Sequence, residues 1–410
     1  MIGTGNDQAR VRGRDEVADF ARRCFTGTPG DRVGVELEFL VVHPADPARR
    51  VPVDEVRAAL PPLPAGAVAG FEPGGQLELS GPPVTLDRAI AGLRADVAAV
   101  RRALGEAGLA LAGPGLDPLR PPVRQLREPR YDAMADLLGV PYGPMMMCLT
   151  ASIQVNVDFG PCPAARWERA CLLGPVLSAA FANSPLAEGR PCGWTSGRQA
   201  VWLHLDPTRT RPLPAGGDPA AAWARYLADA RLMLARPPGA RRRGPPSRVT
   251  FAHWMRRPGL GGRPPTMADL AYHATTVFPP VRPRGWLEVR YLDALDPARW
   301  PVCVAVTAAL LLDDRAADAA LAAAAPLAGR WWQAARSGLA DDGLRRAAEE
   351  CFGAALAALP RLGCDTRLAA EVEAYAARHV CTGRSPAVDV LDRAAAGPAA
   401  AFQTGEEVPA

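Results

Sequence analysis

Four segments of the sequence alternate apolar residues with carboxylates, amides and an arginine, with a period of two residues. This period predicts β-strands with one apolar and one polar face. The polar positions are Glu36 and Glu38 within residues 33–41, Gln76 and Glu78 within 76–80, Gln154, Asn156 and Asp158 within 152–158, and Glu288 and Arg290 within 286–290. A merely solvated face would be rich in Thr, Lys and Ser. We therefore predict an antiparallel sheet whose polar face is a site for cations and phosphate.

The glutamates of this face are of the type that binds magnesium. Same-face residues two apart on a strand are separated by roughly 6.5–7 Å, so Glu36 and Glu38 can hold separate ions or hold two ions from one side. Mg²⁺ binds carboxylate oxygens, together with water and substrate phosphate. Close carboxylates repel each other in a partly dry site, and cations are the simplest neutralisers. The predicted ligands are Glu36, Glu38, Glu78 and Glu288, with Gln154 as a neutral one. The alternative is a salt-bridged polar face without any ligand.

A glycine-rich turn and several arginines complete this set. Residues 73–75 read Pro-Gly-Gly and connect Glu72 to the second strand, so the turn is expected to bring backbone N–H groups to the site. The planar guanidinium group of arginine can donate two parallel hydrogen bonds to a phosphate or carboxylate group. The candidates are Arg198, Arg209, Arg282, Arg284 and Arg290. Arg290 is the strongest because it alternates with Glu288. Arg198 is next, because it precedes an expected fifth alternating strand at 201–206.

Composition excludes several classes of protein. All 47 basic residues are arginine, and the absence of lysine excludes a P-loop, a protein-kinase site and a Schiff-base site. An enzyme of this composition that handles ATP must hold the phosphates with Mg²⁺ and arginine. The net charge of +4 and the lack of long basic runs argue against binding to nucleic acid or to a membrane surface. No G-x-S-x-G or H-E-x-x-H motif is present.

The cysteines and the apolar runs indicate in which cellular compartment the protein is expected. The nine cysteines are scattered and form no C-x-x-C pair, so we expect reduced thiols that are mostly buried. No signal peptide is visible, and the longest apolar run, 302–312, is too short to span a bilayer. We expect a folded, cytoplasmic protein.

The pattern along the chain predicts an α+β fold with two parts and a tail. Residues 1–300 form a sheet-centred catalytic core, residues 301–395 a helical region packed on that core, and residues 396–410 a disordered tail. Helical spacing is expected at 13–24, 54–60, 85–108, 130–138, 163–181, 220–234, 303–312, 315–325, 327–338, 342–358 and 366–379. Residues 144–148 are expected to be a buried strand, and residues 212–218 and 236–248 mobile loops.

Taken in order, these segments resemble the glutamate–cysteine ligase family, in the branch that includes plant enzymes and bacterial enzymes of the ergothioneine pathway. The resemblance covers residues 34–300 and is carried by 34–39, 72–80, 147–156, 198–209 and 273–290. It implies a glutamine-synthetase-like fold, in which a curved antiparallel sheet forms a funnel with helices on its outer face. It also implies ATP-dependent joining of the glutamate γ-carboxylate to the cysteine amine through a γ-glutamyl phosphate.

The resemblance also implies roles for individual residues. The implied metal ligands, for two or more Mg²⁺ ions, are Glu36, Glu38, Glu72, Glu78 and Glu288, and the implied nucleotide-binding side chains are Gln154 and Gln76. Arg198 and Arg290 are implied catalytic residues. The contacts to substrate or phosphate are expected from Arg198, Arg209, Arg282, Arg290 and Asn156.

Two alternatives stay open at the level of sequence. A related ligase could join glutamate to an amine other than cysteine, because the loops that bind the acceptor amine carry no clear sequence motif. A nucleotide-binding regulator without turnover would be expected to lose part of the carboxylate set, which this chain retains in full. The sequence does not reveal the oligomeric state.

Overall fold

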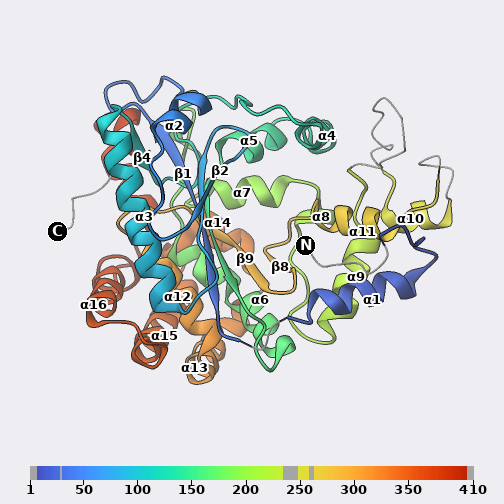
Figure 1. Ribbon diagram of the computed structural model, residues 1–410. Helices are drawn as coiled ribbons and strands as arrows, with labels where there is room; N and C mark the ends of the chain where they lie inside the picture. Colours follow the sequence, from blue (N-terminus) through green and yellow to red (C-terminus); the bar gives the residue numbers. More distant parts are fainter. Residues whose placement is uncertain (1–6, 28–29, 234–247, 258–262, 404–410) are drawn as a thin grey trace.

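The computed structural model describes residues 7–27, 30–233, 248–257 and 263–403 (Figure 1). Its centre is one seven-stranded sheet in which every paired strand is antiparallel. The strands are β1 (Val33–Val42), β2 (Val68–Phe71), β3 (Leu77–Ser80), β4 (Ala110–Ala112), β5 (Ser152–Val157), β8 (Val281–Pro283) and β9 (Leu287–Asp293). Their order is β2-β3-β1-β5-β9-β8, with β4 also paired to β1. All four strands expected from alternation are confirmed.

The register of the sheet aligns the polar positions of neighbouring strands. Glu38 is opposite Glu78 across β1 and β3, and Glu36 is opposite Gln154 across β1 and β5. Asn156 of β5 is in turn opposite Glu288 of β9. Directly opposed residues have their side chains on the same face of a sheet. The carboxylates expected from separate strands therefore collect on one face.

Three helices cover the apolar face of the sheet. They are α3 (Leu86–Glu106), α6 (Pro163–Ala180) and α12 (Trp300–Leu312), which contact β1, β9 and β5 respectively. Their buried residues and those of the strands form one continuous core. Every residue of α12 is buried, because further helices enclose it on its outer side.

Those further helices come from the C-terminal third of the chain, and Figure 1 shows α13, α15 and α16 below and to the left of the sheet. They are α13 (Asp314–Ala324), α14 (Trp331–Ser337), α15 (Asp342–Ala358), α16 (Thr366–Tyr375) and α17 (Pro386–Ala394). The expected tail differs from the structure. Pro398–Phe402 form a 3-10 helix, and Phe402 is buried against Leu40 and Val42 of the sheet. Residues 404–410 lie outside the described residues.

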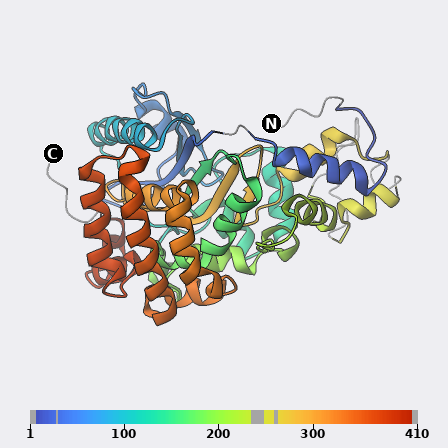
Figure 2. The same cartoon turned by 90° about the horizontal axis from the view of Figure 1, so that it is seen from below.

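A second group of helices lies at the opposite end of the molecule from the C-terminal helices (Figures 1 and 2). It consists of α1 (Arg14–Cys24), α9 (Pro219–Asp229), α10 (Phe251–Arg256) and α11 (Met267–Ala274). The loop expected at 236–248 falls almost wholly outside the described residues. The short α2 (Val53–Ala59) packs near α3, at the edge of the sheet where β2 and β4 lie.

The remaining helices lie beside the polar face, and two of them correct the sequence analysis. They are α4 (Pro129–Leu138), α5 (Tyr142–Leu149), α7 (Gly197–His204) and α8 (Pro207–Thr210), while β6 (Leu186–Ala187) and β7 (Arg190–Pro191) form a small separate hairpin. Residues 144–148 belong to helix α5 and not to a strand, since a short apolar run does not distinguish the two. Residues 201–206 are likewise not a strand but the end of α7 and the start of α8.

The start of helix α7 is indicated in the sequence by a capping residue. Ser196 caps the helix by accepting a hydrogen bond from the backbone N–H of Gln199. A serine followed three residues later by glutamine is typical of a helix start. The helix places Arg198 and Trp202 four residues apart on one side, and both reach the polar face of the sheet.

Two further findings concern the cysteines and the apolar helices. All nine cysteines lie in described residues and are unpaired, as expected. Among the described residues, none of the helices has the length and apolar character needed to cross a membrane.

Candidate active site

A cavity of about 300 Å³, measured as the space open to the centre of a water molecule, lies on the polar face of the sheet. Its floor consists of side chains of β1, β3, β5 and β9. Helices α4, α5 and α7 and the segment around Thr275 and Phe278 form its walls. The predicted residues that line it are Glu36, Glu38, Glu72, Gln76, Glu78, Gln154, Arg198, Arg282, Glu288 and Arg290. Arg284, a further candidate arginine, lines it as well, so eleven of the thirteen candidate residues meet in one cavity.

Three carboxylates form an acidic cluster at one end of this cavity. Glu38, Glu72 and Glu78 each place a carboxylate oxygen within 4.8 Å of the others. Glu38 also accepts hydrogen bonds from the Ser152 backbone N–H at 2.8 Å and from Gln154 at 3.1 Å. These two donors leave further carboxylate lone pairs free, so the cluster has the composition of a magnesium site.

The turn before β3 holds Glu72 in this cluster. Gly75 has φ +93°, a conformation that favours glycine, and its N–H donates to the Glu72 carbonyl at 2.8 Å. A Cβ atom on Gly74 would lie 2.3 Å from the Cys148 carbonyl oxygen, so the turn packs directly on α5. The N–H of Glu72 donates to Gln76. The turn thus fixes a carboxylate, whereas the sequence analysis expected its backbone N–H groups to serve the site.

Burial and mutual repulsion make these carboxylates hard to ionise without a cation. Burial, together with the charges of Glu288, Glu78 and Glu38, raises the pKa of Glu36 to about 7. Burial likewise raises the pKa of Glu38, and that of Glu72 well above its ordinary value. Glu36 therefore holds a proton up to near neutral pH unless a divalent cation displaces it.

The other end of the cavity is basic, and Glu288 lies at its centre. Glu288 is fully buried, and its carboxylate accepts hydrogen bonds from the guanidinium of Arg282 at 2.5 and 3.1 Å and from that of Arg284 at 2.9 Å. The guanidinium of Arg290 forms an ion pair with it at 3.3 Å. Burial alone would raise its pKa, but the three guanidinium groups outweigh burial and hold it well below the ordinary range. Both oxygens of this carboxylate contact arginines, so Glu288 holds the three arginines together. Its expected role as a magnesium ligand stays a prediction.

Gln154 joins the acidic and basic ends. Its Nε2 donates to Glu38 at 3.1 Å, and its Oε1 accepts from Arg290 Nη1 at 2.6 Å. Both ends of the amide are thus engaged by protein groups. Gln154 positions Glu38 and Arg290 relative to each other, which differs from the nucleotide contact implied by the family resemblance.

Arg198 carries a charge in the cavity that the protein leaves partly unpaired. Its side chain is 3% exposed, and Nη2 donates to the Arg290 carbonyl at 2.8 Å. Its Nε and Nη1 have no hydrogen-bond partner, although Asp293 lies 3.8 Å from Nη1. A buried guanidinium with free donors is suited to an anionic ligand.

Asp293 organises the segment that carries Arg198. Its carboxylate accepts hydrogen bonds from Ser184 Oγ at 2.7 Å, Ser196 Oγ at 2.9 Å and the Asn183 backbone N–H at 2.9 Å. Ser184 Oγ also accepts from the Arg198 backbone N–H at 3.0 Å. The start of α7 is therefore fixed to β9 by a buried polar network that sequence reasoning did not find.

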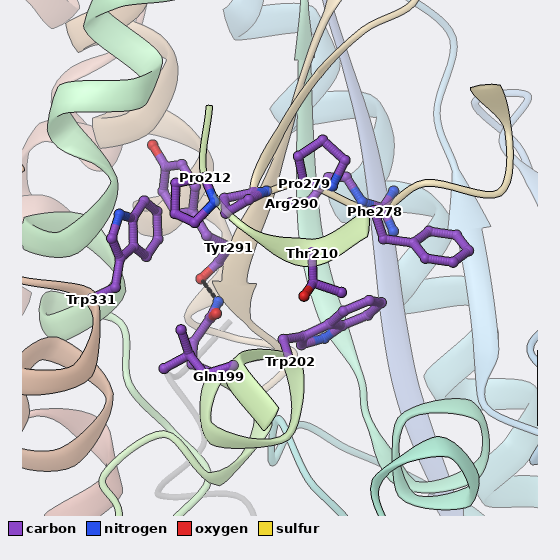
Figure 3. Close-up of a pocket in the computed structure, with 11 residues that line it drawn as sticks. Gln199, Trp202, Thr210, Pro212, Phe278, Pro279, Arg290, Tyr291 and Trp331 are labelled. Carbon is purple, nitrogen blue, oxygen red and sulfur yellow. Dashed lines mark hydrogen bonds between the residues drawn. The ribbon is translucent and has the colours of Figure 1, made fainter. Parts of the chain in front are cut away.

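A smaller cavity of about 20 Å³ adjoins the large one behind Arg290 (Figure 3). The two share Trp202, Phe278 and Arg290. Gln199 closes the small cavity by donating from Nε2 to the Tyr291 carbonyl at 2.5 Å, the bond drawn in Figure 3. Its volume suffices for about one water molecule, so the large cavity is the candidate reaction chamber.

The remaining predicted residues lie in different places. Gln76 lines the cavity, and its Oε1 is buried without a partner while Nε2 donates to the Thr150 carbonyl. Asn156 lies beside the cavity and bridges Glu36 and Trp286. Arg209 is fully buried within the helical layer, where it donates to the carbonyls of residues 231 and 276. Arg209 therefore has a structural position, and its expected contact with substrate is not supported.

The walls contain residues that the sequence analysis missed. They are Arg130, Tyr131 and Met134 of α4, Met146 and Met147 of α5, and Trp202, Thr275 and Phe278. Most of these are apolar or aromatic residues of helices and loops, and nothing in their spacing distinguishes them from core residues. Trp202 and Phe278 contact each other at 5.8 Å between ring centroids and cover Arg198 and Arg290 respectively.

Comparison with known proteins places this cavity in a family. The glutamate–cysteine ligase family 2 (GCS2) matches residues 32–406, so the chain belongs to that family. The chain is 43% identical to the glutamate–cysteine ligase EgtA of Mycobacterium tuberculosis over 417 residues, which are 97% of this chain and 94% of the relative. It is 44% identical to EgtA of Mycolicibacterium smegmatis over 385 residues, covering 90% and 88%.

More distant relatives agree with this placement. A chloroplastic glutamate–cysteine ligase of Arabidopsis thaliana is 34% identical over 262 residues, covering 61% of this chain and 50% of the relative. The crystal structure of a glutamate–cysteine ligase from Francisella tularensis in complex with AMP superposes with a TM-score of 0.52 at 16% identity. It covers 92% of this chain and 87% of that chain. The latter likeness shows the fold, and it confirms the expected fold class.

Proposed function

We propose that this protein is an ATP-dependent glutamate–cysteine ligase that forms γ-glutamylcysteine, as its EgtA relatives are named to do. The observation that carries the proposal is the division of one cavity into a carboxylate cluster and an arginine cluster. This is the charge pattern needed to hold Mg²⁺ and the phosphates of ATP in a chain without lysine. The extent of the EgtA match supports γ-glutamylcysteine for ergothioneine synthesis as the product.

The acidic cluster fits magnesium by the chemistry of its donors. Glu38, Glu72 and Glu78 offer oxygen ligands, and Glu36 lies on the same sheet face. When bound there, Mg²⁺ would neutralise charge on the phosphoryl group that is transferred. We propose two or more ions, because four carboxylates on one face of the cavity exceed what one ion requires.

The residues of the cavity suit the two chemical steps. The γ-carboxylate of glutamate attacks the γ-phosphorus of ATP, which gives γ-glutamyl phosphate and ADP. Arg198 lines the cavity and has two donors without a protein partner, so it suits a substrate carboxylate, while Arg290 and Arg282 suit the phosphoryl oxygens. The deprotonated amine of cysteine then attacks the acyl carbon, and inorganic phosphate leaves. Neither step needs a covalent bond to the enzyme.

The direct test measures phosphate and ADP release from ATP with glutamate and each amino acid in turn. We expect turnover only with ATP, Mg²⁺ and L-glutamate together, and the highest kcat/KM with cysteine. Preference for another amine would favour the related ligase, and the absence of turnover would favour a regulator. Formation of AMP and pyrophosphate, or full activity in excess EDTA, would contradict the mechanism.

The raised carboxylate pKa values predict how magnesium binding depends on pH. A group with pKa about 7 in the apo cavity is mostly protonated at pH 6 and mostly ionised at pH 8. Because Mg²⁺ binds the ionised form, its affinity should be about tenfold weaker at pH 6 than at pH 8 for one displaced proton. The increase in Tm on adding Mg²⁺ at each pH measures this difference.

The variant Glu72→Gln tests in the same experiment whether the acidic cluster is the site that binds Mg²⁺. It removes one carboxylate of the cluster and should abolish most of the Mg²⁺-induced increase in Tm at both pH values. It should not lower the Tm measured without Mg²⁺, since the raised pKa of Glu72 favours its neutral form and the amide that replaces it is also neutral. An equal Mg²⁺ effect at pH 6 and pH 8 in the wild type would refute the link between these carboxylates and the metal.

A further inference from the structure

The polar face of the sheet continues beyond the acidic cluster as a small apolar surface. On β1 the alternation runs on from Glu36 and Glu38 to Leu40 and Val42, which are both buried. Side chains two residues apart on a strand share a face, so these two extend the face that carries the glutamates. Ala112 and Ala110 of β4 lie directly opposite them.

Residues near the C-terminal end of the chain cover this apolar surface. Phe402 is 5% exposed, and it packs in one cluster with Leu40, Val42, Ala112, Ala151 and Ala294. The preceding residue, Ala401, is buried against Leu186 and Val390. A segment far from the sheet in sequence therefore closes the end of the face on which the carboxylates lie.

Phe402 also covers a buried ion pair. The Arg120 guanidinium lies 5.3 Å from the centroid of the Phe402 ring. Arg120 Nε donates to Asp117 at 2.6 Å, and Nη1 donates to the Val41 carbonyl of β1 at 3.0 Å. The side chains of the pair are only 5% and 1% exposed. An arginine withdrawn from water interacts more strongly with an aromatic ring than an exposed one, so the ring helps to hold Arg120 against β1.

Both the ion pair and the ring contact the short segment between α5 and β5. The Asp117 N–H donates to the Leu149 carbonyl at 2.8 Å, and the Ala151 N–H donates to the Gly115 carbonyl at 3.0 Å. The Ala151 carbonyl in turn accepts from the Ala294 N–H at 3.0 Å. Hydrogen bonds to two other parts of the chain thus hold this segment, and the Phe402 ring packs beside it.

The same segment supports the acidic cluster directly. The Thr150 carbonyl accepts a hydrogen bond from Gln76 Nε2 at 2.8 Å, and the Ser152 N–H donates to the Glu38 carboxylate at 2.8 Å. Any shift of this segment would therefore move the groups that orient Gln76 and Glu38.

We propose that Phe402 is a positioning residue for the magnesium site, although it does not touch the reaction chamber. Its ring holds residues 149–152 and the end of β1, and through them the carboxylate of Glu38. The proposal rests on the proposed function, because it takes the acidic cluster to bind Mg²⁺.

The expected effect of losing the ring follows from packing. Truncation of Phe402 would leave a cavity beside Leu40 and Ala151, and the surrounding backbone would relax into part of it. Mg²⁺ requires near-ideal octahedral geometry, so a small displacement of Glu38 weakens its binding.

The test compares the same truncation at two buried phenylalanines. Phe402→Ala removes the ring, and Phe402→Leu is the conservative variant that keeps most of the apolar packing. Phe352→Ala is the matched control, because Phe352 is 1% exposed and packs on Phe181 and Tyr375 in the main core, outside the Phe402 cluster. The control loses packing but should not move the acidic cluster.

The first readout is the free Mg²⁺ concentration that gives half-maximal activity at a fixed concentration of Mg·ATP, measured well below the Tm of each variant. We expect it to rise at least fivefold in Phe402→Ala, with kcat at saturating Mg²⁺ within about twofold of wild type. Phe402→Leu should restore it to within about twofold, and Phe352→Ala should lower the Tm without changing it. An unchanged Mg²⁺ requirement in Phe402→Ala, or an equal rise in Phe352→Ala, would overturn the proposal.

A variant with a smaller change covers the case in which Phe402→Ala does not fold. Phe402→Val then replaces it and should raise the Mg²⁺ requirement more than Phe402→Leu does. Equal requirements in Phe402→Val and Phe402→Leu would contradict a positioning role.

Hydrogen exchange separates this proposal from the proposed function, since it needs neither turnover nor a bound metal. Peptides that contain residues 149–152 should exchange at least fivefold faster in Phe402→Ala than in wild type or in Phe352→Ala. Unchanged exchange would overturn the proposal even in an active ligase. If Mg²⁺ neither activates the wild type nor raises its Tm, the proposed function and the role of Phe402 in metal binding both fail. Faster exchange would then show only that the ring holds this segment.

Discussion

Arg290→Lys is expected to lower kcat/KM by roughly 10²–10³, equivalent to about 2–4 kcal/mol of transition-state stabilisation. Arg290 donates to Gln154 at 2.6 Å and lies 3.3 Å from Glu288, and its guanidinium is 5.9 Å from the Phe278 ring centroid. The planar guanidinium group of Arg290 can contact these neighbours and still donate a hydrogen bond to a phosphoryl or carboxylate oxygen. A lysine ammonium keeps the charge but cannot reproduce that geometry.

Steady-state kinetics with each substrate varied in turn would measure this loss. The fold should survive, because the charge and most of the bulk remain, and circular dichroism and Tm check this point. Arg88→Lys, an exposed position on α3, is the matched control and should leave kcat/KM unchanged. A change of less than about threefold in Arg290→Lys would remove Arg290 from the reaction.

Glu288→Gln is expected to lower the free energy of unfolding by about 3–5 kcal/mol, the usual cost of removing one partner from a buried ion pair. Glu288 is 0% exposed and neutralises Arg282, Arg284 and Arg290. A neutral amide would leave three guanidinium groups close together in a buried site. Activity should also fall sharply, because these arginines form the basic end of the cavity.

Denaturant unfolding of the wild type and the variant measures this cost. Glu350→Gln, an exposed position on α15, is the control and should change stability by no more than about 0.5 kcal/mol. The Glu288 pKa is depressed in the folded state, so its contribution is present above the ordinary value of about 4.5 and is lost as the pH falls below it. The deficit of Glu288→Gln should therefore shrink in acid. An unchanged stability at neutral pH, with only a greater need for Mg²⁺, would restore Glu288 as a metal ligand.

Much of the sheet and its site could be predicted because a strand has a strict period of two. Within each strand, that period places the polar residues on the face opposite the apolar ones, as for Glu36 and Glu38, Gln154 and Glu288. Antiparallel pairing then brings those faces together, as the opposition of Glu38 and Glu78 shows. Arg290 was found because it alternates with Glu288, whereas Arg198 was found beside an expected strand at 201–206 that the structure shows to be helical.

Other predictions failed where the local pattern is ambiguous. Residues 144–148 and 201–206 are short, and an apolar or alternating run of that length fits a helix or a strand. Their helices are decided by the cap at Ser196 and by the packing of α4, α5 and α7 on one another. Arg209 resembled Arg198 in sequence, yet it lies buried among backbone carbonyls of the helical layer.

By itself, the sequence determined the polar face of the sheet, the set of acidic and basic side chains on it, and the exclusion of lysine-based phosphate chemistry. Only the tertiary structure decided which charged groups surround each carboxylate. Glu38 and Glu288 occupy equivalent alternating positions, but Glu38 is opposite another glutamate and Glu288 is surrounded by three arginines. The pKa of the first is raised and that of the second is lowered for this reason. The charge around a residue comes from cross-strand neighbours and hairpin turns, and a strand's own periodicity carries no information about them.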